Sequence, residues 1–212
     1  MSFTRHWAQT RFEMLSPNLN RFLKASYRYR EDFLSLKTDP STATREDAYF
    51  AQIIIVRFQD SWGQFVRGLV VSSSSGLAQT ISGRQISSGL SFHGTAQVEN
   101  WLLQNRGTNR EPDWHVSDVA LRYANRLRPS NFSDISSAIG SVNSPEKAMR
   151  DYRNFVVHRN KSTADRVRIN PELRAFSANE LQMLPFAWST GGIAVFEDWL
   201  RRFELVARVA SS

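Results

Sequence analysis

The longest run of apolar residues at helical spacing, DAYFAQIIIVRFQDSWGQFVRGLV, covers residues 47 to 70 and limits the fold classes that this chain can adopt. Apolar residues recur there every three or four positions, which is the spacing of one face of an α-helix. Thr44, followed three residues later by Asp47, has the pattern of a capping box at the start of a helix. We therefore predict a long helix that begins near Thr44 and ends near Val71.

Helical spacing also dominates the rest of the sequence, and little of it alternates as β-strands do. It covers an amino-terminal segment with Trp7 and Phe12, and then about residues 18–36, 96–105, 116–127, 131–140, 145–160 and 193–209. Ser144 is the predicted N-cap of the helix at 145–160, with Pro145 at its first position. Residues 168–186 are expected to mix loop and short helix. The predicted fold class is an all-α bundle.

One segment breaks this pattern. SSSSGLAQTISGRQISSGLSFHGT, residues 72–95, is rich in Ser and Gly and has no apolar stripe. It is expected to be either an ordered polar excursion, such as a short hairpin, or a mobile loop. Because no internal repeat and no convincing linker divides the chain, we predict a single domain over residues 1–212.

The charge of the chain is strongly positive, with a formal net charge of +7 at pH 7. Of the 27 basic residues, four are lysine and 23 are arginine. Arginine presents a planar fork of donors that matches phosphate oxygens and stacks on bases. This excess favours a polyanionic partner such as RNA, although a basic surface also serves as a simple solubility device.

Several kinds of site are excluded by residues that the chain lacks. It has no cysteine, which removes disulfides, thiolate zinc sites and cysteine nucleophiles together. Its four histidines lie far apart and form no H-x-x-x-H or H-E-x-x-H pair, and no phosphate-binding loop pattern is present. We therefore expect neither a metal ion nor a cofactor.

The location of the protein is expected to be the cytoplasm. The first residues, MSFTRHWAQTRFEML, carry charges and a tryptophan where a signal peptide would need an apolar run. The apolar stretch AYFAQIIIV is stopped by Arg57 well short of a membrane span. The lack of cysteine is consistent with a reducing compartment. We expect a soluble protein with no membrane partner.

The stretch RNFVVHRNK, residues 153–161, holds the candidate site. On an ideal helix Asn154 and His158 lie about 40° apart and share a face, whereas Arg153 lies about 140° around from His158 and about 7.5 Å along the axis. Histidine can move protons near neutral pH, and arginine can stabilise charge on phosphorus, so these residue types suit RNA cleavage without a metal. The alternative is that His158 only caps a helix carboxyl end and the arginines are surface residues.

In this helical context RNFVVH resembles the signature of the HEPN superfamily, R-[NHD]-x-x-x-H, at Arg153, Asn154 and His158. IVRFQDSWGQFVRGLV is similar to the long helix of bacterial HEPN proteins, and LRPSNFSDISSAIG is similar to the stretch that precedes their motif helix. Many members carry Gly after the His, whereas Arg159 follows here, which predicts a helix that runs on to about residue 160.

The resemblance implies a HEPN-like helical bundle that forms a homodimer through its motif helices. It implies metal-independent cleavage of RNA that leaves a 2′,3′-cyclic phosphate, in a toxin or phage-defence setting with an antitoxin or defence-system partner. His158 would be the general base or acid, Arg153 the phosphate stabiliser and Asn154 the orienting residue. Further RNA contacts are expected from Arg150, Arg159 and Lys161. Two alternatives remain: a non-catalytic module that binds a nucleotide or RNA, and an interaction protein whose helices dock a partner.

Overall fold

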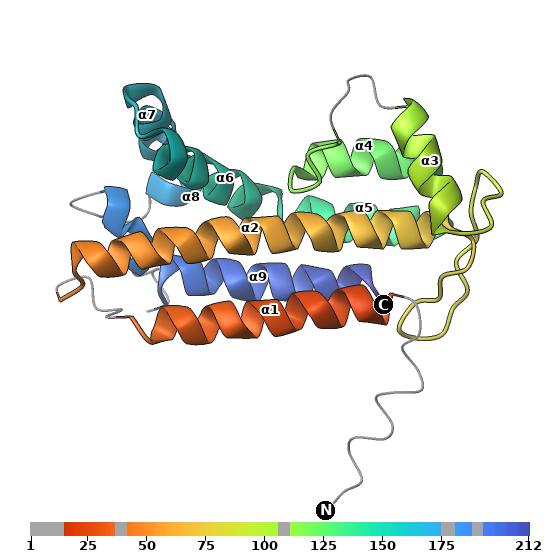
Figure 1. The fold of residues 1–212 in the computed structure, drawn as a ribbon, viewed down its shortest axis with the longest axis horizontal. Helices are drawn as coiled ribbons and strands as arrows, with labels where there is room; N and C mark the ends of the chain where they lie inside the picture. The colour runs from red at the N-terminus through yellow and green to blue at the C-terminus, as the bar shows by residue number, and fades with distance from the viewer. Residues whose placement is uncertain (1–14, 37–41, 106–110, 175–180, 188–192) are drawn as a thin grey trace, which may run out of the picture. The chain divides into compact units, whose positions relative to one another are not determined.

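The structure is a computed structural model that describes residues 15–36, 42–105, 111–174, 181–187 and 193–212. In these ranges the chain is helical and forms no β-strand beyond isolated bridges, so the predicted all-α fold class is confirmed. Figure 1 shows the helices: α1 Ser16–Leu34, α2 Arg45–Ser74, α3 Thr95–Asn105, α4 Ser117–Leu127, α5 Phe132–Ser141, α6 Asn143–His158, α7 Lys161–Ile169, α8 Pro171–Arg174, the 3₁₀ helix η1 Leu181–Phe186 and α9 Val195–Ala210.

The long helix α2 begins as predicted. The Thr44 backbone N–H and hydroxyl both donate to the Asp47 carboxylate, and the Asp47 N–H donates back to the Thr44 hydroxyl. The helix ends at Ser74, three residues beyond the predicted end at Val71. The amino-terminal segment with Trp7 and Phe12 lies outside the described residues.

By its internal contacts the chain divides into two compact units. Unit 1 takes the described residues up to Leu23, Trp62–Ser141 and Val206–Ser212, and unit 2 takes Lys24–Ser61 and Val142–Leu205. Helices α1, α2 and α9 therefore each contribute residues to both units. The single domain over residues 1–212 stays a prediction.

In unit 1 three aromatic rings of α1 and α2 pack together. Ring centroids lie 5.6 Å apart for Phe22 and Trp62, 5.1 Å for Phe22 and Phe65, and 5.5 Å for Trp62 and Phe65. One turn further along α2, a Cβ atom on Gly68 would lie 2.5 Å from the Asn18 side chain. Glycine thus permits the close approach of α1 to α2 in this unit.

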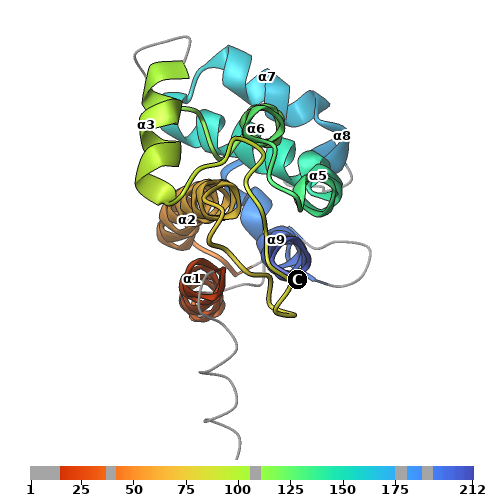
Figure 2. The same cartoon turned by 90° about the vertical axis from the view of Figure 1, so that its right-hand side faces the viewer.

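The segment between α2 and α3 contains a short hairpin, one of the two arrangements expected for it. Gln79 and Gln85 form an antiparallel bridge, and the Ile86 N–H donates to the Ala78 carbonyl at 2.8 Å. Ala78 and Ile86 are fully buried, so this polar segment has its own apolar anchor. Figure 2 shows it passing beside the carboxyl-terminal end of the chain, where the Ile81 N–H donates to the Ser211 carbonyl at 2.9 Å.

In unit 2 the core is an aromatic cluster around Phe58 of α2, whose side chain is fully buried. Its ring meets three others edge-on, at centroid distances of 6.3 Å to Tyr29, 5.9 Å to Phe196 and 5.5 Å to Phe203. Edge-to-face pairs of this kind add to the free energy gained by burying the rings. The cluster joins residues of α1, α2 and α9 that belong to this unit.

Replacing Phe58 by alanine should lower the free energy of unfolding by about 3 to 5 kcal/mol, because it removes a fully buried ring and leaves a cavity. The matched control is Tyr49→Ala in the same helix, whose side chain is 55% exposed and which should change the free energy by less than about 0.5 kcal/mol. Urea unfolding followed by circular dichroism measures both. A loss under about 1 kcal/mol for Phe58→Ala would contradict the packing described.

Candidate functional site

The helix that carries RNFVVH, α6, begins at Asn143 and not at Pro145. Its N-cap is Val142, whose side chain cannot cap, so the prediction of Ser144 as N-cap is wrong. The first turn carries Glu146, which is 1% exposed and whose carboxylate lies 3.5 Å from the Arg150 guanidinium. A carboxylate in the first turn is favoured by the positive end of the helix macrodipole.

One face of α6 anchors the helix in unit 2. Ala148, Met149 and Tyr152 are all fully buried, at positions i, i+1 and i+4. Burial raises the pKa of the Tyr152 hydroxyl well above its ordinary value, although its hydrogen bond to Gln52 and the charge of Arg159 oppose this shift. The hydroxyl therefore stays neutral. Further along the helix, Arg153 and Asn154 are half-buried, and Val157 and His158 at its end are exposed.

The structure brings two of the three motif residues together. Arg153 and Asn154 are half-buried, and Arg153 Nη1 donates a long hydrogen bond of 3.4 Å to Asn154 Oδ1. The side chain of His158 is exposed, one turn beyond Asn154 in the same helix, and forms no hydrogen bond or ion pair with any described residue. Within one chain, the described geometry thus leaves the imidazole apart from the guanidinium of Arg153.

His158 is the last residue of α6, so the prediction of a helix running on to about residue 160 is wrong. Arg159 adopts the left-handed conformation with φ 43° and ψ 42°, and its N–H donates to the Phe155 carbonyl at 2.8 Å. This is the helix-ending conformation that glycine usually takes, and a residue with a Cβ pays about 1 to 2 kcal/mol to adopt it. Arg159 thus ends the helix without a glycine.

A buried glutamine, which sequence reasoning missed, holds this helix end. Gln52 of α2 is 5% exposed, and its Oε1 accepts a hydrogen bond of 3.2 Å from Arg159 Nη2. Its side chain also bonds the hydroxyl of Tyr152. Because Gln52 and Arg159 lie 107 positions apart, no local pattern could reveal the contact. The left-handed Arg159 is thus tied to the core of unit 2 by its own side chain.

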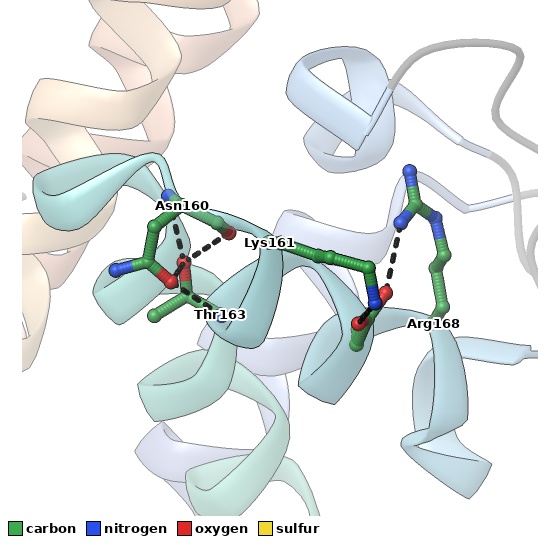
Figure 3. Close-up of polar contacts among 5 residues, drawn as sticks. Asn160, Lys161, Thr163 and Arg168 are labelled. Carbon is green, nitrogen blue, oxygen red and sulfur yellow. Dashed lines mark hydrogen bonds and ion pairs between the residues drawn. The ribbon is translucent and has the colours of Figure 1, made fainter.

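After Arg159 the chain enters α7, a helix absent from the prediction. Asn160 is its N-cap, and it forms a capping box with Thr163, whose N–H donates to Asn160 Oδ1 at 2.9 Å (Figure 3). Only Arg159 and Asn160 separate the two helices, so His158 lies at a tight junction between the end of α6 and the start of α7. Helix α7 packs against α6, as Figure 1 also shows.

The three cations expected to contact RNA all have protein partners as well. Arg150 pairs with Glu146, Arg159 with Gln52, and Lys161 Nζ lies 2.7 Å from Asp165 Oδ2. Figure 3 shows Lys161 and Arg168 reaching the same carboxylate. The hydrogen bond from Lys161, together with the charge of Arg168, lowers the pKa of that Asp165 carboxyl.

Neighbouring Arg166 of α7 is exposed, and its side chain makes no polar contact with the described residues. It was not among the predicted RNA contacts. In a chain with 23 arginines, sequence alone gives no reason to choose it over the others. Unlike the side chains of Arg150, Arg159 and Lys161, that of Arg166 is thus not bound to another described side chain.

Two further properties of the described part of the chain bear on the site. Among those residues, no group of three or more His, Cys, Asp or Glu side chains is placed to hold a metal ion. None of the helices within the described ranges is long and apolar enough to cross a lipid bilayer.

The conformation of Arg159 yields a stability prediction. Arg159→Gly and Arg159→Ala both delete the bond to Gln52, but only alanine keeps the penalty of a left-handed Cβ, so the glycine variant should be more stable by about 1 kcal/mol. At exposed Lys147, in the middle of α6, the order should reverse, with alanine better than glycine by about 1 kcal/mol. Denaturant unfolding of the four variants measures both differences. Equal stabilities at position 159 would show that Arg159 is not left-handed.

Comparison with known proteins adds no relative. No protein-family model, no curated protein and no solved structure matches this chain. The resemblance to the HEPN superfamily therefore rests on the motif and the similar stretches around it, and the membership stays a prediction.

Proposed function

We propose that this protein is a metal-independent endoribonuclease that acts in the cytoplasm as a toxin or phage-defence effector. The observation that carries the proposal is the place of His158. It is the last residue of an anchored helix, one turn after Asn154. Its side chain is exposed and forms no hydrogen bond with any described residue. A histidine that only stabilised the fold would be expected to use its ring nitrogens on protein partners.

The chemistry needs three tasks that these residue types can perform. The RNA 2′-oxygen attacks the adjacent phosphorus while the bond from phosphorus to the 5′-oxygen breaks, which leaves a 2′,3′-cyclic phosphate. A base takes the 2′-hydroxyl proton and an acid protonates the leaving 5′-oxygen, and His158 suits either role. Arg153 would stabilise the charge that builds on the phosphate oxygens, and Asn154, held by Arg153, would orient the substrate or the imidazole.

The separation of Arg153 from His158 supports a homodimer in which two motif helices face each other. Arg153 of one chain would then act with His158 of the partner chain across a twofold axis. The exposed side of the last turn of α6 also carries Val157, whose side chain is 52% exposed. An apolar residue next to the imidazole fits a protein interface better than bare solvent.

The alternative is a non-catalytic module that binds RNA or a nucleotide with the same residues, or that docks a partner. One observation favours it: no described residue orients the His158 ring. Catalytic histidines usually have a hydrogen-bond partner that fixes the tautomer and the ring direction. Under this alternative, the arginines and His158 all contribute to binding of the ligand, and none of them takes part in a reaction.

Replacing His158 by alanine should separate the two possibilities. It removes the proton-transfer group but leaves the cationic surface, so cleavage of a labelled structured RNA should fall by about 10²-fold or more while its affinity changes less than about threefold. Exposed His93 in unit 1 is the matched control, and His93→Ala should cut RNA like the parent protein. Gel-based cleavage in excess chelator and fluorescence anisotropy measure the two quantities.

Three results would count against the enzyme. Parent-like cleavage by His158→Ala would remove the catalytic assignment and favour the binding module. Loss of the folded state in that variant, seen as a lower melting temperature, would show a structural role for His158. Cleavage that vanishes in EDTA and returns with magnesium would exclude a metal-independent mechanism.

A mixing experiment tests the shared site. Arg153→Ala and His158→Ala should each be inactive as homodimers, but random exchange of chains should restore about a quarter of parent activity, because half of the dimers then hold one intact site out of two. Light scattering at micromolar concentration should show a dimer for both variants. If the mixture stays inactive although the chains exchange, Arg153 and His158 act within one chain.

A further inference from the structure

A cavity of about 180 Å³ opens in unit 1, and none of its lining residues belongs to the motif helix α6. Its charged lining comes from Arg67 of α2, Glu99 of α3 and Glu111. Its apolar lining is formed by the side chains of four residues: Leu102, Leu103, Pro112 and Trp114. Apolar protein cavities of roughly 150 Å³ bind molecules of the size of benzene, so this one suits a ligand of about six non-hydrogen atoms.

The charged lining is unbalanced. Arg67 Nη2 donates to Glu99 Oε1 at 3.0 Å, and Arg67 Nε donates to Glu111 Oε1 at 2.5 Å. The Trp114 indole N–H donates to the same Glu111 oxygen at 3.2 Å. One guanidinium thus faces two carboxylates, which leaves one negative charge in excess. Among the described residues, the Oε2 atoms of both glutamates accept no hydrogen bond.

The guanidinium already faces two carboxylates, which disfavours an anionic ligand. Burial lowers the pKa of Arg67, but the hydrogen bonds and charges of the two glutamates outweigh this effect and raise the pKa above its ordinary value. Arg67 therefore stays charged and committed to carboxylates that already surround it. An incoming carboxylate or phosphate would meet the excess negative charge and would have to displace one of these partners.

The apolar lining lies directly beside this charge. Leu103 is 54% exposed, and Leu102 and Trp114 are buried at 6%. An alkyl chain that covered Leu103 would be removed from water together with it. The lining is thus complementary to a ligand that is apolar along most of its length and positively charged at one end.

We propose that this pocket binds a small organic cation, an ammonium or guanidinium carried on a short aliphatic chain. The positive group bonds the two unused carboxylate oxygens of Glu99 and Glu111, and the chain lies along Leu102, Leu103 and Trp114. The same chemistry is offered by a free amine and by a Lys or Arg side chain of a peptide. The proposal is independent of ribonuclease activity.

The test follows the indole N–H signal of Trp114 in ¹H–¹⁵N spectra of the full chain, assigned by its loss in Trp114→Phe. Titration with n-butylammonium should shift this signal saturably, 1-butanol should bind at least about tenfold more weakly, and butyrate should not bind. Agmatine and an acetylated, amidated arginine tripeptide then distinguish the two sources. Tighter binding of agmatine indicates a free small cation, and tighter binding of the tripeptide indicates a peptide side chain. Equal shifts with butylammonium and 1-butanol would overturn the proposal.

Four variants sharpen the result. Glu99→Gln and Glu111→Gln should each weaken butylammonium binding by about tenfold, because each removes one charged acceptor. Asp118→Asn, an exposed change in the same unit that leaves the pocket lining intact, should have no effect. His158→Ala should bind the cation like the parent even if it no longer cuts RNA. Unchanged affinity in both Gln variants would overturn the proposal.

An arginine of the chain itself provides a last control. Arg110 precedes Glu111 in the sequence and lies outside the described residues. If Arg110→Ser strengthened butylammonium binding by about tenfold or more, the pocket would be occupied by the chain itself, and the proposal of an external ligand would fail. Unchanged affinity in this variant supports an external cation.

Discussion

The hydrogen bond from the Arg159 guanidinium to the buried amide of Gln52 fixes the point at which α6 gives way to α7. The left-handed backbone of Arg159 costs about 1 to 2 kcal/mol. A hydrogen bond from a charged donor contributes about 1.5 to 3 kcal/mol, less where it is partly exposed, and the capping box of Asn160 adds about 1 kcal/mol. The two gains together offset the strain, and His158 is exposed because the helix stops there.

Local patterns allowed the sequence to predict those parts of the fold that depend on neighbours in the chain. The capping box of Thr44 and Asp47 is such a pattern, and so is the apolar stripe that defines α2. The pattern at Asn160 and Thr163 is equally local, but it was overlooked because the helix ahead of it was expected to continue. Helix α7 was missed for this reason.

Long-range contacts account for most of what the sequence could not predict. The role of Gln52 depends on a partner 107 positions away, and without it Arg159 gives no sign of a left-handed conformation. The division into two units depends on which parts of α1, α2 and α9 pack together, and each of these helices has one continuous pattern along the chain. Of the candidate site, the helix and the one-turn spacing of Asn154 and His158 were predictable, whereas the helix end and the partners of the cations were not.

The position of the imidazole sets a clear requirement for the proposed chemistry. The imidazole of His158 has no partner within the described residues, so in the proposed mechanism the substrate or a second chain would orient its ring. The pocket around Arg67 shows the opposite situation: among the described residues that line it, one guanidinium serves two carboxylates, and each carboxylate keeps an oxygen without a described donor. Among the described residues, the imidazole of the first site thus has no hydrogen-bond partner, and the second site has more acceptor atoms than donors.

The sharing of three helices between two units has a consequence for synthesis on the ribosome. Domains usually fold as contiguous pieces while the rest of the chain is still being made. Here unit 2 needs Val195–Leu205 of α9 and unit 1 needs the residues from Val206 onward, so neither unit can be completed until α9 has left the exit tunnel. The nascent chain would thus hold an incomplete unit 2, the unit to which the motif helix α6 belongs, until α9 has emerged.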